Sequence, residues 1–174
     1  KGFAHLGVFK AMNELNIPID VIGGTSAGSI VASQIALGTS LDDIINRNKK
    51  VNALNMFKEY GLPYISLIKS KKIEEAAKLS AQNRDIEDLW IPFFAPATDL
   101  NNSKLILFES GTLWEAIRSS GALPGIVLPH FKDNNILVDG GLMNNLPVDI
   151  MRNKYGGKII CSSCSADQSM KTEI

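Results

Sequence analysis

This chain of 174 residues contains few histidines and cysteines and carries no formal net charge. Two histidines and two cysteines are present, and 18 basic residues balance 18 acidic ones. Zero net charge offers no electrostatic attraction for a nucleic acid, so we expect no nucleic-acid partner. The cysteines, Cys161 and Cys164, cannot complete a four-ligand zinc site, and nothing thioredoxin-like surrounds them. We interpret them as ordinary cysteines at a strand end, with a redox pair as the alternative.

Long apolar runs are also absent. No stretch approaches the ~18 residues that a membrane-spanning helix needs, and no signal peptide is visible. A neutral surface still allows binding to a membrane, because interfacial binding can rest on apolar side chains. Length and composition, with 45% hydrophobic and 21% charged residues, fit one globular domain. The chain begins with Lys1 rather than Met, so we expect it to be a piece of a longer protein.

The hydrophobic pattern alternates between helical and strand-like segments. This alternation predicts an α/β domain with at least five strands and three layers. Pro96 lies within one expected strand and weakens that assignment, because proline cannot donate to a β-ladder. The helices are expected at residues 4–16, 27–37, most of 40–82, 112–119 and 145–154, and the strands at 19–22, 91–99, 104–109, 136–138 and 158–161.

The strongest local signal is the stretch Gly24-Thr25-Ser26-Ala27-Gly28, between an expected strand and an expected helix. A nucleophile elbow requires this context, because it holds a serine hydroxyl at the end of a strand. The positive end of the following helix favours the negative charge that develops there. A structural glycine-rich turn is the alternative interpretation. Ser26 is therefore the candidate nucleophile.

A nucleophilic serine needs a base, and three residues are candidates. His5 lies near the start of the first helix and is more simply a packed or capping residue. His130 follows Leu128-Pro129 in an expected loop. Asp139 ends an expected strand and precedes two glycines, and active groups gather at the carboxyl ends of strands in open α/β sheets. A carboxylate shielded from water accepts a proton more readily than one in solvent, although Asp-Gly-Gly also suits a surface turn.

The combination resembles the patatin-like phospholipase family, in its neuropathy-target-esterase-like branch. The matching stretches are Lys1–Gly7, Gly24–Gly28, Ile86–Pro92, Ala97–Asp99, Gly111–Trp114, Ser119–Pro124 and Asp139–Pro147. The resemblance implies a three-layer α/β/α fold with a mostly parallel central sheet. It also implies a dyad of Ser26 and Asp139 without a histidine, in which Gly24, Gly28, Gly140 and Gly141 are the motif glycines.

The family forms its oxyanion hole from a Gly-Gly-Gly-x-Lys/Arg-Gly loop after its first strand. Only Lys1 and Gly2 match that loop here, and the N–H of Ala27 is a further expected donor. A single patatin-like domain over residues 1–174, truncated at its start, is therefore expected. Loss of one oxyanion donor costs ~100- to 1,000-fold in turnover. We expect the chain as given to be poorly active and a longer chain to be active.

The resemblance implies a serine hydrolase that cleaves phospholipid or lysophospholipid esters through an acyl-enzyme. It would act at a membrane or micelle surface, and no metal or organic cofactor is implied. Two other classes stay open at this point. The first is a lipid acyltransferase that uses the same dyad, and the second is a non-catalytic lipid-binding domain.

Overall fold

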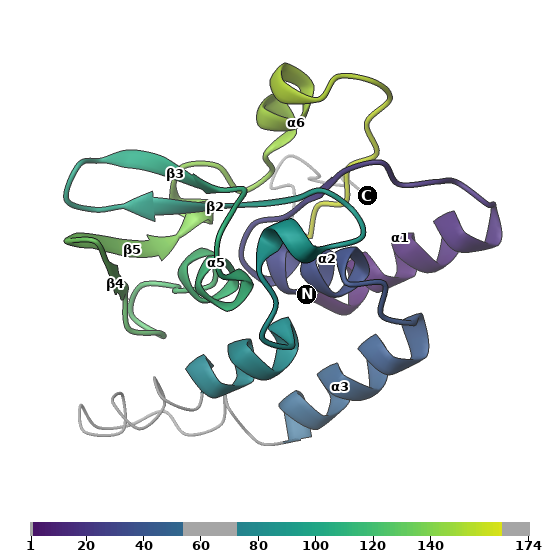
Figure 1. The fold of residues 1–174 in the computed structure, drawn as a ribbon, viewed down its shortest axis with the longest axis horizontal. Helices are drawn as coiled ribbons and strands as arrows, with labels where there is room; N and C mark the ends of the chain where they lie inside the picture. The colour runs from purple at the N-terminus through teal and green to yellow at the C-terminus, as the bar shows by residue number, and fades with distance from the viewer. Residues whose placement is uncertain (1, 54–72, 165–174) are drawn as a thin grey trace, which may run out of the picture.

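The computed structural model describes residues 2–53 and 73–164, which form one sheet with helices around it (Figure 1). The helices are α1 (Gly2–Glu14), α2 (Ala27–Ala36), α3 (Leu41–Ala53), an unlabelled helix over residues 73–81, α5 (Leu113–Ser120) and α6 (Val148–Lys154). The strands are β1 (Ile22–Gly23), β2 (Phe93–Asp99), β3 (Lys104–Phe108), β4 (His130–Lys132) and β5 (Asn135–Asp139). Single 3₁₀ turns, η1 (Ile86–Asp88) and η2 (Gly140–Leu142), complete the set.

The sheet has the order β1-β2-β5-β4, with β3 on the other edge of β2. It is mixed: β1 pairs with β2 in parallel, whereas the three other described pairings, β2–β3, β2–β5 and β4–β5, are antiparallel. Within the described residues, parallel pairing is thus limited to the strand that leads to Ser26. Antiparallel pairing prevails because β2 and β3, and likewise β4 and β5, are neighbours in sequence joined by short turns.

Strands β1 and β5 meet head to head along one edge of β2. Strand β1 pairs with Phe93 and Phe94, and β5 pairs with residues 97–99. Pro96 lies between these two ladders. The N–H and C=O groups of successive residues in a strand point to alternate edges. Phe94 O and Leu100 N both form hydrogen bonds at the edge that faces β1 and β5. An N–H at position 96 would therefore point to this same edge. Because neither β1 nor β5 pairs with Pro96, this central strand tolerates the proline that weakened its prediction.

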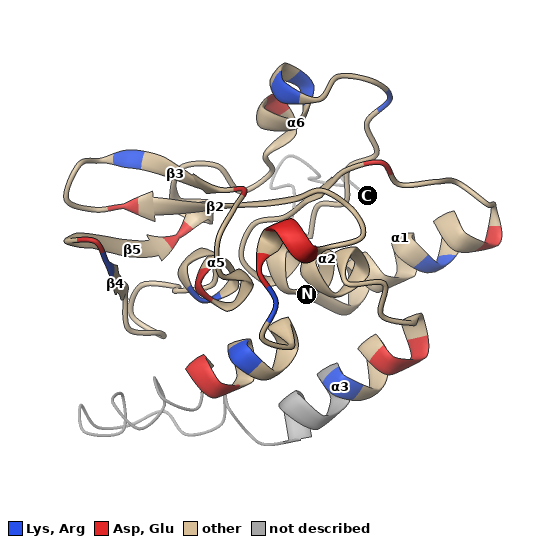
Figure 2. Cartoon of the chain, in the orientation of Figure 1, with Lys and Arg blue, Asp and Glu red and all other residues tan. Residues whose placement is uncertain are grey.

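The main hydrophobic core lies between one face of the sheet and two helices. Small residues of β2 and α2 allow close packing against α5, and Figure 1 shows both helices on the same side of the sheet. Seven of the ten residues of α2 are buried, and none of the ten is charged, so its ribbon is tan in Figure 2. The core residues that these elements contribute are Ala32, Ala36, Phe93, Ala95, Ala97, Leu113, Ala116, Ile117 and Leu137.

The opposite face of the sheet is covered in part by the α6 segment. Phe94 points away from α5, and its ring stacks on that of Tyr155 at 5.9 Å between centroids and 12° between planes. Tyr155 Oη donates a 2.8 Å hydrogen bond to Glu109, which also pairs with Lys154. Burial and this carboxylate raise the pKa of Tyr155 to about 12. Helices on both faces confirm the layered α/β architecture.

Most predicted elements are present, and three differ from prediction. His130 lies in β4 rather than in a loop, because Asp133 and Asn134 adopt positive φ values of 50° and 63° and close a tight hairpin with β5. The last predicted helix is shorter and follows η2. The predicted strand at 158–161 is not a strand, since no described strand pairs with it and Ile160 is exposed. Residues 54–72 of the predicted 40–82 helical region lie outside the described residues.

Candidate active site

Ser26 lies at a sharp turn between β1 and α2. Gly24 N donates to Phe94 O at 3.2 Å as β1 ends, and α2 begins at Ala27. Ser26 itself has a φ of 56° and a ψ of −124°. A positive φ is unfavourable for a residue with a Cβ and persists only where the surroundings enforce it. This strand–turn–helix geometry is the one that a nucleophile elbow requires.

The two motif glycines of the elbow differ in the space around them. A Cβ on Gly24 would lie 2.7 Å from Ser29 N and closer still to the Gly28 carbonyl group, so the first turn of α2 packs directly on Gly24. A Cβ on Gly28 would meet nothing nearer than His5 Nε2, at 3.9 Å. Of these two glycines, therefore, only Gly24 lies so close to the backbone of α2 that no larger residue fits at its position.

Asp139, at the end of β5, is 2% exposed and is held on three sides. Its Oδ1 accepts a 2.7 Å bond from Gly141 N. Its own N–H donates to Ala122 O at 3.0 Å, and its carbonyl accepts from Thr98 Oγ1 at 3.1 Å. The carboxylate is thus buried and oriented by the glycine pair that follows it.

The elbow and the Asp139 segment are in direct contact. A Cβ on Gly140 would lie 3.2 Å from Thr25 Cγ2 and 2.8 Å from the carbonyl carbon of Pro96, so no side chain fits between the ends of β1 and β5. Thr25 Oγ1 donates to Asn144 O at 3.0 Å, beyond η2. The contact follows from the head-to-head arrangement of β1 and β5.

The end of α5 and the residues that follow it bond to both Ser26 and Asp139. Ser120 Oγ accepts from Ser26 N at 3.0 Å, and two residues later the Ala122 carbonyl accepts from Asp139 N. In the sequence this stretch contributes to the family resemblance, which implies no role for Ser120. Nothing in its local pattern shows that its hydroxyl reaches the elbow, which is 94 residues away in the chain.

The predicted oxyanion residues lie around the start of α2. Ala27 is the first residue of α2, where helix geometry leaves N–H groups without a partner inside the helix. Gly2 is the first residue of α1, and a Cβ there would lie 3.9 Å from Val31 Cγ2, so the start of α1 packs on α2. Lys1 lies outside the described residues.

Neither histidine is hydrogen-bonded to Ser26 or Asp139 in the described part of the chain. His5 Nδ1 lies 2.8 Å from Ser162 Oγ, and Cys164 Sγ lies 3.5 Å from its Nε2. His130 packs edge-on against Trp114, with 5.7 Å between ring centroids. Of the three candidate bases, Asp139 is therefore the one whose neighbouring residue, Gly140, is in contact with the elbow.

The surroundings of His130 predict a pH dependence of stability. The pKa of His130 is lowered, mainly by burial and next by the positive charge of Arg118. Lys132 lowers this pKa as well, whereas Glu115 and Glu74 raise it. The unfolded chain, with an imidazole pKa of about 6.5, binds the proton more readily. We therefore expect stability to fall as the pH drops from about 7.5 to about 5. Urea unfolding should show a smaller fall for His130→Gln, and an unchanged slope would contradict this assignment.

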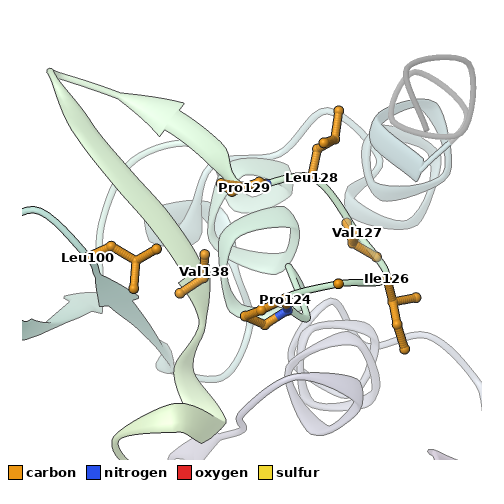
Figure 3. Close-up of a pocket in the computed structure, with 8 residues that line it drawn as sticks. Leu100, Pro124, Ile126, Val127, Leu128, Pro129 and Val138 are labelled. Carbon is orange, nitrogen blue, oxygen red and sulfur yellow. The ribbon is translucent and has the colours of Figure 1, made fainter. Parts of the chain in front are cut away.

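Apolar residues line an open pocket of about 250 Å³ beside β5 (Figure 3). Its wall combines the segment after α5 with Val138 of β5 and Leu100 of the β2–β3 turn. No charged side chain lines it, so it suits hydrocarbon rather than a polar group. The lining residues are Leu100, Pro124, Gly125, Ile126, Val127, Leu128, Pro129 and Val138.

Comparison with known proteins agrees with this geometry. A family model described as patatin-like phospholipase matches residues 1–152. The chain belongs to the patatin-like phospholipase family. This patatin-like chain is 35% identical over 156 residues to lysophospholipase NTE1 of Mycosarcoma maydis, covering 87% of this chain and 8% of that protein. It is 33% identical over 167 residues to human patatin-like phospholipase domain-containing protein 6, covering 92% and 12%.

A solved structure shows the same fold. VipD from Legionella pneumophila superposes with a TM-score of 0.64 at 15% identity, covering 84% of this chain and 45% of that one. The predicted family, its branch and the patatin fold are thus confirmed. The patatin-like chain spans about a tenth of the length of the curated relatives it matches. None of its described helices is long and apolar enough to cross a membrane.

Proposed function

We propose that the chain hydrolyses acyl esters of phospholipids or lysophospholipids, with Ser26 as nucleophile and Asp139 as general base. The observation that carries this proposal is the strained elbow at Ser26, which contacts the segment of a buried carboxylate. Relatives named as phospholipases and lysophospholipases support a lipid ester hydrolase. The apolar pocket beside β5, which is lined in part by Val138, the residue before Asp139, supports a substrate with a hydrocarbon chain.

The proposed reaction has two steps. Asp139 accepts the proton of the Ser26 hydroxyl as its Oγ attacks the ester carbonyl. Backbone N–H groups at Ala27 and in the Lys1–Gly2 segment stabilise the oxyanion. The tetrahedral intermediate collapses, the C–O bond to the lipid alcohol breaks, and Asp139 returns the proton to that alcohol. Asp139 then deprotonates a water molecule, whose oxygen attacks the carbonyl of the acyl-enzyme. The bond between Ser26 Oγ and the acyl group breaks, the fatty acid leaves, and Asp139 returns the proton to Ser26 Oγ.

A fluorophosphonate probe tests the nucleophile directly. We expect a single phosphonylated residue, Ser26, when the labelled full-length protein is digested and analysed by mass spectrometry. Labelling elsewhere with Ser26 unmodified would refute the assignment. Product analysis with an added lipid alcohol then separates hydrolysis from acyl transfer, since only a transferase converts the added alcohol into a new ester.

Two uncharged segments next to the site support a lipid surface as the place of reaction. No Lys, Arg, Asp or Glu occurs in 119–131 or in 140–148 (Figure 2). These segments carry exposed large apolar side chains, which can insert into the boundary of a lipid layer. The six residues are Leu123, Ile126, Phe131, Leu142, Met143 and Leu146.

Charged substitutions in these segments should weaken binding to lipid vesicles. We expect Leu142→Asp to reduce the activity on vesicle-bound substrate about 30-fold, since burying a leucine side chain is worth roughly 2 kcal/mol. Activity on a water-soluble short-chain ester should stay within about twofold. Leu15→Asp, at an exposed residue after α1, is the matched control. Equal losses on both substrates, or in both variants, would contradict a lipid-facing role for Leu142.

A further inference from the structure

The peptide groups on both sides of Ser26 are held by two other serine hydroxyls. Ser120 Oγ accepts from Ser26 N at 3.0 Å, and Ser29 Oγ donates to Ser26 O at 2.6 Å. Ser29 N adds a bond of 2.9 Å to the same carbonyl. Both Ser29 and Ser120 are 0% exposed, so water cannot replace either hydroxyl. A buried peptide group that loses such a partner is costly to leave unpaired.

Ser26 occupies the N-cap position of α2 but makes no side-chain capping bond. A serine at this position ordinarily accepts a bond from an N–H of the first helical turn. Its hydroxyl would then be occupied and turned toward the helix. Here the peptide bonds to Ser120 and Ser29 maintain the turn instead. The Ser26 hydroxyl is thereby left for chemistry although its residue starts a helix.

Ser120 also connects the elbow to the carboxylate. It is the last residue of α5, and Gly121 ends that helix through a 3.0 Å bond to Ile117 O. The next residue, Ala122, bonds to the backbone of Asp139. The positions of Ser26 and Asp139 are therefore both tied to one short buried turn.

We propose that Ser120 and Ser29 are positioning residues that hold Ser26 in its strained conformation and aim its hydroxyl at the ester. Neither touches the substrate; each acts through the backbone of Ser26. This inference rests on the proposed role of Ser26 as nucleophile. Its consequence is that their removal lowers the rate of the chemical step and leaves substrate binding intact, because misplacement by about 1 Å can cost on the order of 100-fold.

The helix provides a matched control for Ser29. Ser33 lies one turn later in α2, is equally buried, and donates to Ile30 O at 2.9 Å, which is the same bond to the carbonyl three residues back. Ser29→Ala and Ser33→Ala therefore remove equivalent helix bonds, and only the first reaches Ser26. In the full-length protein we expect kcat to fall about 10- to 100-fold for Ser29→Ala with KM unchanged, and about twofold or less for Ser33→Ala.

Ser120→Ala should lower kcat at least as much as Ser29→Ala, because it leaves the Ser26 N–H without a partner. Ser120→Cys, which keeps a weak acceptor of similar size, should restore part of the rate. The rate of fluorophosphonate labelling at Ser26 should follow kcat in every variant. If Ser120→Ala does not fold, Ser29→Ala still tests the proposal, because Ser26 O keeps its bond from Ser29 N.

A Ser26→Ala variant in the same series separates the two levels of inference. If it keeps its activity, the proposed function fails, whatever the other variants do. If it is inactive while Ser29→Ala and Ser120→Ala keep wild-type kcat and labelling rates, the positioning role is overturned and the proposed function stands. A loss that is equal in Ser29→Ala and Ser33→Ala would also overturn it, since the effect would then be one of helix stability.

Discussion

Replacing Ser26 by alanine should lower lipid ester hydrolysis at least about 1,000-fold, because no covalent intermediate can form without its hydroxyl. Asp139→Asn should have an effect of the same order, since the amide oxygen cannot accept the proton as a carboxylate does. The buried carboxylate accepts a bond from Gly141 N, which an amide oxygen can also accept, so the fold should persist. Release of fatty acid from a lysophospholipid by the full-length protein measures both effects.

The control for this pair is His130→Ala, which should keep most of the activity. His130 lies in the outer strand β4, and its ring packs on Trp114. Within the described residues this ring makes no hydrogen bond to Ser26 or Asp139. Thermal unfolding should accompany each assay, because loss of this half-buried ring removes packing. If the His130→Ala protein were well folded but inactive, the base would have to be the His130 imidazole rather than the Asp139 carboxylate.

Gly24→Ala should abolish activity and destabilise the domain by roughly 1–3 kcal/mol or more. Its Cβ would press into the backbone of Gly28 and Ser29, which are the first turn of α2 and cannot yield as a side-chain end can. A displacement of that turn moves the Ser26 hydroxyl and the Ala27 N–H together. The measurements are urea unfolding and the rate of fluorophosphonate labelling.

Gly7→Ala serves as the comparison for Gly24→Ala. Gly7 lies in α1, and a Cβ there would meet nothing within 4 Å. Alanine at such a helical position should stabilise by about 0.5–1 kcal/mol and leave the labelling rate unchanged. Wild-type stability and labelling in Gly24→Ala would show that the elbow does not need its close backbone contact.

The parts of the site that lie in short local patterns could be predicted from the sequence. The elbow glycines and Ser26 follow one strand and begin one helix, and Asp139 ends another strand, so local periodicity places both. The supporting residues could not be predicted in this way. Ser120 and Ser26 are 94 residues apart, and only the packing of α5 between β2 and α2 brings them together.

The errors in the predicted fold have physical causes of the same kind. Residues 158–161 have the composition of a strand, but strand formation also needs a neighbour, and none of the described strands pairs with them. Pro96 weakened the prediction of β2 because proline lacks an N–H, yet the gap between β1 and β5 removes the need for one. The sequence predicts a loop at His130 because this residue follows Leu128-Pro129, and the Asp133-Asn134 turn that makes it part of a hairpin is a weaker signal than Asn-Gly.

The head-to-head arrangement of β1 and β5 makes β2 the element that sets the distance between Ser26, the proposed nucleophile, and Asp139, the proposed base. Strand β1 pairs as far as Phe94 and β5 begins its pairing at Ala97, so two residues of one strand, Ala95 and Pro96, separate the two ladders. Each strand residue adds about 3.3 Å. Insertion of one residue near Pro96 would thus spread the two halves of the site apart while each kept its own motif intact. The spacing of the proposed active site is thus encoded in a strand that supplies none of its proposed reactive groups.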